Sequence, residues 1–209
     1  MADGAFGRAR LKIVLIVEGE TEEAFLEPLR GFLQKRLRGN MPRFSPNKHD
    51  GRIPTGAKLK RVVERHLAEG ADAVIALTDV YTGTREFADA ADAKKKMSDW
   101  VGSTTKFYPH AAQYDFEAWL IPYWERIQTL SGSNRAKPSR SPELLNHTKP
   151  PAYRITEIFA TGKKRFYSKP RDARKILEGQ DLSIAANECR ELKALLNTIL
   201  SLCGGEPLG

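Results

Sequence analysis

One run of five consecutive aliphatic residues constrains the fold of this chain more than any other feature. Residues 13–17 read Ile-Val-Leu-Ile-Val, without a polar interruption. Such a run predicts a strand buried on both faces, as in a parallel sheet covered by helices. Glu18 and Gly19 follow it directly. Open α/β sheets build their sites at the carboxyl ends of their strands, so we expect Glu18 to lie at a site.

The same arrangement of a buried strand and a closing acid recurs at residues 73–78, which end at Asp79. Helical periodicity or helix-opening signals predict helices near residues 21–38, 56–69, 84–101, 115–128 and 188–202. Further short strands are predicted near residues 43–45 and 106–112. This alternation predicts an α/β fold with a mostly parallel sheet flanked by helices.

A stretch rich in Ser, Pro and Asn at residues 130–151 divides the chain. We expect an α/β core over residues 11–129 and a basic extension over residues 130–203 that packs on the core and ends in a helix. The two cysteines have neither the number for a disulfide framework nor the spacing of metal ligands. No apolar run approaches the roughly 18 residues that span a bilayer, and the first ten residues lack the apolar segment of a signal peptide. We therefore expect a cytoplasmic protein without membrane contact.

The positive charge of the chain is concentrated in one region. Residues 130–175 contain twelve Lys or Arg and three acids, whereas the rest of the chain is nearly neutral. A regional excess of this kind favours a docking surface for a polyanion. The expected phosphate contacts are Lys163, Lys164, Arg165, Lys169, Arg171 and Arg174, with Phe166 or Tyr167 stacking on bases. Two alternatives remain: a solvated charged face, or a docking site for an acidic protein.

Further acids are predicted at the same edge of the sheet as Glu18 and Asp79. Glu22 lies one helical turn after Glu18, and Asp115 and Glu117 follow the strand predicted at residues 106–112. Carboxylates are the hard oxygen ligands that Mg²⁺ or Mn²⁺ prefers, so the acids predict a divalent-metal site. For Glu22, Asp115 and Glu117, an interaction with the dipole of a helix N-terminus is an alternative explanation.

His110 closes the strand at residues 106–112. It could orient a ligand or a phosphate, or it could be a local hydrogen-bonding group.

These residues form an ordered set of motifs that resembles the Toprim superfamily, shared by topoisomerases, bacterial primases and nucleases of the overcoming-lysogenization-defect class. The set comprises Val17-Glu18-Gly19-x-Thr21-Glu22, Asp79-x-Tyr81, and His110 followed after four residues by Asp115-Phe116-Glu117-Ala118-Trp119-Leu120. Together with residues 141–146 and 165–169, it is similar to a bacterial Toprim-like family of unknown function. The resemblance covers about residues 11–200.

The resemblance implies a Toprim-type fold, Mg²⁺ dependence and phosphodiester chemistry on nucleic acid, with relatives often encoded beside ATPases in phage-defence loci. The implied nuclease would use Glu18, Asp79 and one of Asp115 or Glu117 as metal ligands, and Glu22 as a further ligand or general base. Toprim enzymes carry Asp-x-Asp where this chain has Tyr81 as the second member. The alternative is therefore a catalytically silent module that binds nucleic acid or a partner ATPase.

Overall fold

Four parallel strands form the centre of the molecule in our computed structural model, which describes residues 10–39, 41–80, 86–144, 149–162 and 166–209. The strands are β1 (Lys12–Val17), β2 (Arg43–Lys48), β3 (Ala73–Asp79) and β4 (Phe107–Ala112). Their order in the sheet is β2-β1-β3-β4. Because β1 and β3 are neighbours, Glu18 and Asp79 leave the sheet on adjacent strands at the same edge.

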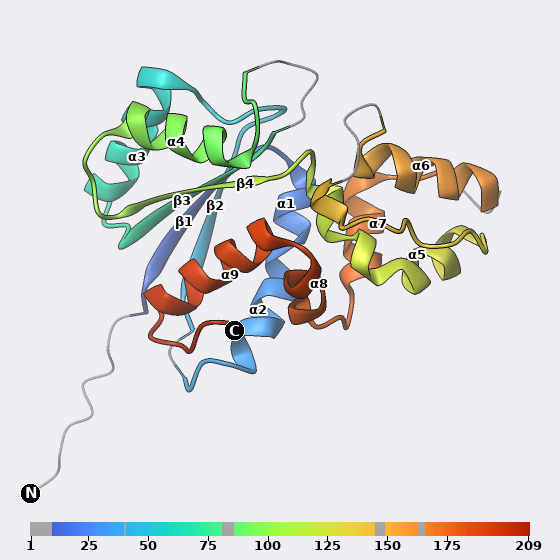
Figure 1. Cartoon of the computed structure of the whole chain (residues 1–209). Coiled ribbons are helices and arrows are strands. Elements are labelled where there is room, and N and C mark those ends of the chain that lie inside the picture. Colours follow the sequence, from blue (N-terminus) through green and yellow to red (C-terminus); the bar gives the residue numbers. More distant parts are fainter. Residues whose placement is uncertain (1–9, 40, 81–85, 145–148, 163–165) are drawn as a thin grey trace, which may run out of the picture.

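Helices cover both faces of this sheet (Figure 1). The first half of the chain contributes α1 (Glu20–Ala24), α2 (Leu26–Gln34), α3 (Gly56–Ala68) and α4 (Ala90–Val101). The second half contributes α5 (Trp124–Ser131), α6 (Pro151–Gly162), α7 (Lys169–Leu177), α8 (Leu182–Glu188) and α9 (Arg190–Leu202). Short 3₁₀ turns lie at η1 (Phe116–Trp119), η2 (Ile121–Tyr123) and η3 (Pro142–Leu144). The predicted α/β fold with a mostly parallel sheet flanked by helices is confirmed.

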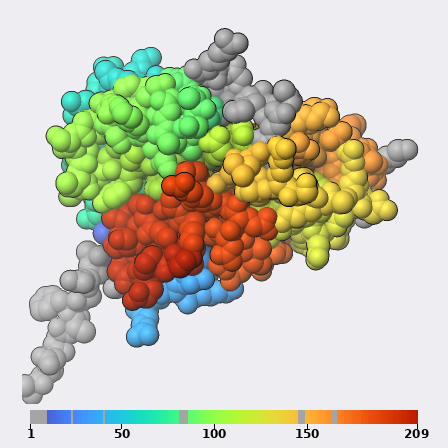
Figure 2. All heavy atoms as spheres, in the orientation of Figure 1, coloured from blue at the N-terminus to red at the C-terminus, as the bar shows by residue number. Residues whose placement is uncertain are grey.

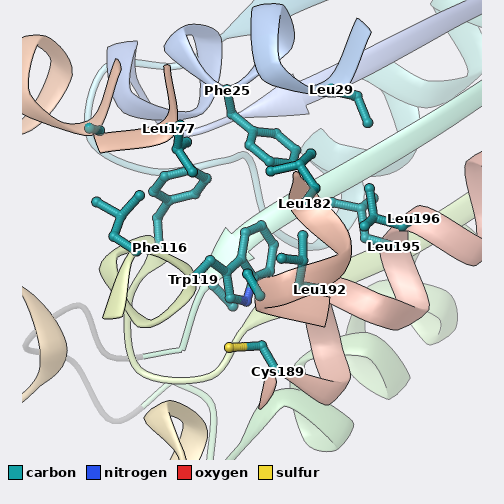
Figure 3. Packing of buried hydrophobic residues seen from close by; sticks show 14 of the residues in the cluster. Phe25, Leu29, Phe116, Trp119, Leu177, Leu182, Cys189, Leu192, Leu195 and Leu196 are labelled. Atoms are coloured by element: carbon teal, nitrogen blue, oxygen red, sulfur yellow. The ribbon is translucent and has the colours of Figure 1, made fainter. Parts of the chain in front are cut away.

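The side chains of β1 divide the core into two apolar clusters because successive residues of a strand point to opposite faces. Val14 and Ile16 pack with residues of α3 and α4 on one face. Ile13 and Leu15 pack with residues of α2 and α9 on the other. Figure 3 shows part of the second cluster, in which Trp119 is surrounded by leucines of the C-terminal helices.

The C-terminal helices belong to this second apolar cluster. Leu192, Leu195 and Leu196 of α9 are almost fully buried in it. Figure 2 shows the surface of α8 and α9, in red, lying between surfaces contributed by α4 and α2. Helices α5, α6 and α7 lie beyond the carboxyl ends of the strands (Figure 1). The basic extension thereby covers one face of the sheet and reaches the edge that carries the acids.

Two of the predicted helices are interrupted, and a proline explains each interruption. The helix predicted at residues 21–38 divides into α1 and α2, because Pro28 has no N–H to donate to the carbonyl of Ala24. The helix predicted at residues 115–128 is replaced by η1, η2 and α5, because Pro122 cannot donate to the carbonyl of Ala118. The apolar residues keep a helical period across Pro28 and Pro122, so the period alone predicted continuous helices.

The helix predicted at residues 56–69 is observed as α3, whereas two other predicted helices start later than expected. Helix α4 begins at Ala90, since the side chain of Asp89 accepts a hydrogen bond from the N–H of Asp92 and caps it there. Residues 84 and 85 of that prediction lie outside the described part of the chain. Helix α9 begins at Arg190 after an extended residue, Cys189. Among the described residues, no helix is long and apolar enough to cross a bilayer.

The close contact between α5 and α6 predicts that adding one methyl group at Gly162 lowers the stability of the protein. A Cβ atom at Gly162 would lie 2.1 Å from the carbonyl oxygen of Ser131. We expect Gly162→Ala to lower the free energy of unfolding by about 1–3 kcal/mol because backbone would have to move. The matched control is Gly31→Ala in α2, where a Cβ meets nothing within 4 Å and a gain of about 0.5–1 kcal/mol is expected. Urea unfolding measures both changes; equal stability of Gly162→Ala and the parent protein would contradict this close approach.

Candidate functional site

Five carboxylates gather at the carboxyl edge of the sheet. Glu18 follows β1, Asp79 closes β3, and Glu22 lies in α1 immediately beyond β1. Asp115 and Glu117 follow β4. Asp79 experiences the charges of all four other acids, so the three strand ends bring the five acids within electrostatic range of one another.

Glu18 and Asp79 are joined by hydrogen bonds between their strands. The Oε1 atom of Glu18 accepts one bond from the hydroxyl of Thr78 and one from the N–H of Asp79, the latter at 3.0 Å. Glu22 is held separately, since its Oε2 accepts the N–H of Gly19 at 3.1 Å. These bonds fix both glutamates in a site where each is only 7% exposed.

Glu117 is held by groups from the basic extension. Its Oε1 accepts a hydrogen bond from the hydroxyl of Tyr167 at 3.2 Å. The ammonium of Lys169, the first residue of α7, lies 3.3 Å from the same oxygen. Glu117 is 1% exposed, so this ion pair places a compensating positive charge against a buried carboxylate.

Asp115 is anchored through one oxygen only. Its Oδ2 accepts the N–H of Ala152, in the first turn of α6, at 3.1 Å. Its Oδ1 is buried and has no hydrogen-bond partner among the residues that the structure describes. A buried carboxylate oxygen without a partner is costly, and it is an acceptor that a ligand in the site can satisfy.

Burial and repulsion between neighbouring charges oppose ionisation of Glu18, Asp115 and Asp79. Burial raises the pKa of Glu18 to about 7, and the nearby charge of Glu22 adds to the shift. Burial, followed by the charge of Glu117, raises the pKa of Asp115 to about 8. Burial and the charges of the other acids raise the pKa of Asp79 well above its ordinary value. Ionisation of all five acids would therefore place more negative charge in the site than its surroundings neutralise, and a bound cation would favour the ionised forms.

The residues present are compatible with a hard divalent cation. All five candidate ligands are carboxylates, and Asp115 Oδ1 is an acceptor in need of a donor or a cation. Within the described ranges, however, no group of three His, Cys, Asp or Glu residues is arranged to hold a metal ion. Glu18 is turned toward Thr78, and Glu117 toward Lys169. Cation binding would require some of these side chains to turn inward.

A family model covers most of the chain: the one described as Domain of unknown function (DUF4276) matches residues 17–200. This chain belongs to the DUF4276 family. No curated protein matches it.

The fold has counterparts among solved structures. One is the C-terminal region of the Burkholderia pseudomallei OLD protein, with a TM-score of 0.53 and 11% identity over 93% of this chain and 100% of the other. Another is the C-terminal region of the Xanthomonas campestris pv. campestris OLD protein, with a TM-score of 0.48 and 12% identity over 93% of this chain and 94% of the other. The first of these likenesses shows that the DUF4276 chain shares its fold with an OLD C-terminal region.

His110 of the DUF4276 chain lies inside β4 rather than at its end. Its side chain is buried on the face covered by α9, where Nε2 lies 3.1 Å from the hydroxyl of Thr198. Burial lowers the pKa of His110 to about 4, and the charge of Lys94 adds to this effect. His110 therefore forms a local hydrogen bond, the second of its two expected roles, and is neutral at pH 7.

The basic residues predicted to contact phosphates occupy different environments. Lys169 faces the acids, while Arg171 and Arg174 lie exposed on α7. Lys163, Lys164 and Arg165 lie outside the described residues. Tyr167 is partly buried against the ring of Phe159, with the ring centroids 5.3 Å apart, and its hydroxyl donates a hydrogen bond to Glu117. Phe166 is 88% exposed and is the more accessible of the two rings predicted to stack on bases.

Three features of this DUF4276 site were not found from the sequence: the bond from Thr78 to Glu18, the bond from Tyr167 to Glu117, and the position of Lys169 against the acids. The contact of Thr78 could have been predicted, since Thr78 is the only polar residue of the run at residues 73–78 and lies on the strand beside Glu18. The contacts of Tyr167 and Lys169 could not have been predicted, because 50 and 52 residues separate them from Glu117.

Proposed function

We propose that this chain is a metal-dependent nuclease, or a related phosphodiester-transfer protein, that acts on nucleic acid with Mg²⁺ or Mn²⁺. The observation that carries the proposal is the set of five carboxylates at one sheet edge, four of which have raised pKa values, beside a basic helix. The fold shared with an OLD C-terminal region and the Toprim-like motifs support it. A role in bacterial phage defence is part of the proposal.

In this proposal, Glu18, Asp79 and Asp115 or Glu117 hold the cation. Mg²⁺ or Mn²⁺ there would supply positive charge against the scissile phosphate and make an attacking water more acidic. Glu22 would accept a proton from that water, since burial raises its pKa above the ordinary value for a glutamate. Tyr167, through its bond to Oε1 of Glu117, would restrict the rotation of that carboxylate.

A cleavage assay tests this proposal. Single-stranded DNA, duplex DNA and RNA of the same sequence would be incubated with the protein in Mn²⁺, in Mg²⁺ or in a chelator. We expect cleavage of at least one substrate in metal and none in the chelator. Cleavage that persists in the chelator, or no cleavage of any substrate in metal, would contradict the enzymatic proposal.

A second candidate is a catalytically silent module that binds nucleic acid or a partner ATPase. The bond of Lys169 to Glu117 favours it, because a fixed ammonium can replace a metal as the counter-charge. The matched OLD structures are described as C-terminal regions, so in those proteins the region accompanies an N-terminal part. Nucleic-acid binding without cleavage, unchanged by metal, is the result this candidate predicts.

Removal of exposed cations from α7 should change the salt dependence of nucleic-acid binding. Arg174 and Lys175 are exposed in the last turn of the helix. Replacing both with Gln should weaken nucleic-acid binding for all sequences and reduce the slope of log K against log salt by about two. The matched control replaces Lys60 and Arg61, two exposed cations of α3 on the opposite face of the sheet. An equal slope for the α7 and α3 variants would show that α7 is only a solvated face.

A further inference from the structure

An aromatic side chain stands almost fully exposed beside the candidate site. Phe166 is 88% exposed, the largest exposed fraction among the bulky apolar residues of the described chain. Its neighbours in sequence are the groups that touch Glu117, since Tyr167 bonds this carboxylate and Lys169 pairs with it. The exposed ring of Phe166 therefore directly precedes in the chain a residue that contacts the site.

The backbone that carries this ring is held at consecutive residues. The carbonyl of Phe166 accepts a bond from Nη2 of Arg171 at 3.3 Å. Tyr167 is fixed through its hydroxyl, and the N–H of Ser168 donates to Oδ2 of Asp172 at 2.7 Å. The exposed ring thus projects from an ordered segment, which lowers the entropic cost of packing a ligand on it.

Arg171 is held in place beside the ring. Its Nε lies 3.1 Å from Oδ1 of Asp172, and its Nη2 lies 3.3 Å from Oδ2. Asp172 is fully buried, while the side chain of Arg171 is 51% exposed. The bonds recorded for Arg171 among the described residues use Nε and Nη2, so the outer part of the guanidinium faces solvent in a fixed orientation that suits a phosphate.

A groove continues from this pair along α7. It has a volume of about 520 Å³ between α1 and α7, and its charged lining residues are Arg171, Arg174, Lys175 and Glu20. Three cations against one acid leave the groove with a net positive charge, which attracts a polyanionic backbone. The arrangement therefore combines an aromatic platform, an oriented arginine and a positively charged track.

From this arrangement we infer that Phe166 and Arg171 bind a single-stranded segment of nucleic acid, with a base stacked on Phe166 and a backbone phosphate on Arg171. A base inside a duplex is already stacked on both neighbours, so away from duplex ends the site selects unpaired over paired strands. The strand would continue along the groove between α1 and α7. The inference rests on the proposed function for the identity of the polymer, but binding does not require cleavage.

Binding measured in a chelator tests the inference without interference from cleavage. An oligonucleotide of about 12 nucleotides would carry one 2-aminopurine, at successive positions in a series of otherwise identical strands. We expect the parent protein to quench the fluorescence most at one position. Phe166→Leu should abolish that quenching and weaken single-strand binding roughly 10-fold, the effect of losing one stacked base. Phe166→Trp should retain both.

Two comparisons make the result specific. Tyr153→Leu removes another exposed aromatic ring, on α6, and should change neither quenching nor affinity. Arg171→Lys keeps the charge beside Asp172 and should weaken single-strand binding through the loss of the guanidinium fork. Unchanged quenching and affinity in Phe166→Leu would overturn the inference. Failure of the proposed function gives a different result: stacking on Phe166 without cleavage of any substrate in metal.

Discussion

Replacing Asp79 with asparagine should abolish metal-dependent cleavage and stabilise the metal-free protein. The substitution keeps the shape of the side chain and removes one negative charge from the five carboxylates. We expect the cleavage rate to fall on the order of 1000-fold, because a ligand that places the cation against the phosphate is lost. We expect the free energy of unfolding at pH 8 to rise, since burial and the charges of the neighbouring acids oppose ionisation of Asp79 and raise its pKa.

The two effects are measured on the same preparations. Cleavage is followed with the substrate that the parent protein cuts, and unfolding is followed in urea with a chelator present. Asp99→Asn is the matched control, because Asp99 is an exposed acid of α4 that pairs with Lys95 at 2.6 Å. It should leave cleavage unchanged and alter stability by less than about 0.5 kcal/mol. Normal cleavage by Asp79→Asn would contradict the assignment of this residue, and a loss of stability would contradict the electrostatic argument.

The metal-free protein should become more stable as the pH falls from 8 to 6.5. The folded-state pKa values of Glu18 and Asp115, about 7 and about 8, lie above their ordinary values of 4.5 and 3.8. The folded protein therefore binds more protons than the unfolded chain in this window, and acidification favours folding. The expected gain is roughly 2 kcal/mol between pH 8 and 6.5.

His110 limits the pH range over which acidification stabilises the metal-free protein. Its folded-state pKa of about 4 lies below the ordinary value of 6.5, so the unfolded chain gains the proton first as the pH falls below 6.5. Protonation of His110 in the unfolded chain lowers the stability of the folded protein and opposes the gain from the carboxyl groups. His110→Gln should remove this contribution and extend the rise in stability toward pH 5.

Metal should reverse the pH dependence between pH 8 and 6.5. Saturating Mn²⁺ should raise the melting temperature most at pH 8, where the carboxylates are ionised, and K⁺ at matched ionic strength should not. Calorimetric scans at each pH, with Mn²⁺, with K⁺ and with a chelator, measure the effect. A melting temperature of the metal-free protein that falls on acidification from pH 8 to 6.5 would contradict the electrostatic argument. An equal response to Mn²⁺ and K⁺ would contradict a cation site among these acids.

The sheet and the acids at its edge were predictable from the sequence because their signals are local. Buried parallel strands appear as uninterrupted aliphatic runs, and the acids that close two of them share an edge in any parallel arrangement. The strand predicted at residues 43–45 extends to Lys48 through Pro46, which is tolerated because β2 lies at the edge of the sheet. The prolines that divide two predicted helices were also visible, but the apolar period outweighed them.

The second half of the site could not be predicted because it depends on long-range packing. Tyr167 and Lys169 reach Glu117 only after α6 has been placed against η1 and α7 against α1. Lys169 looked like one of several solvent-facing cations in a basic region, and no spacing distinguished it from Arg171 or Arg174. The division of the chain at residue 130 and the ligand set of the metal site stay predictions.

Anomalous diffraction from crystals soaked in Mn²⁺ tests the central claim most directly. We predict a peak at the carboxyl edge of the sheet that contacts Glu18 and Asp79. Asp115 or Glu117 should complete the ligands, and if Glu117 is the ligand, its ion pair with Lys169 should be broken. A fully occupied peak elsewhere, or none at saturating Mn²⁺ with Lys169 still on Glu117, would contradict a metal-dependent site and favour the silent binding module.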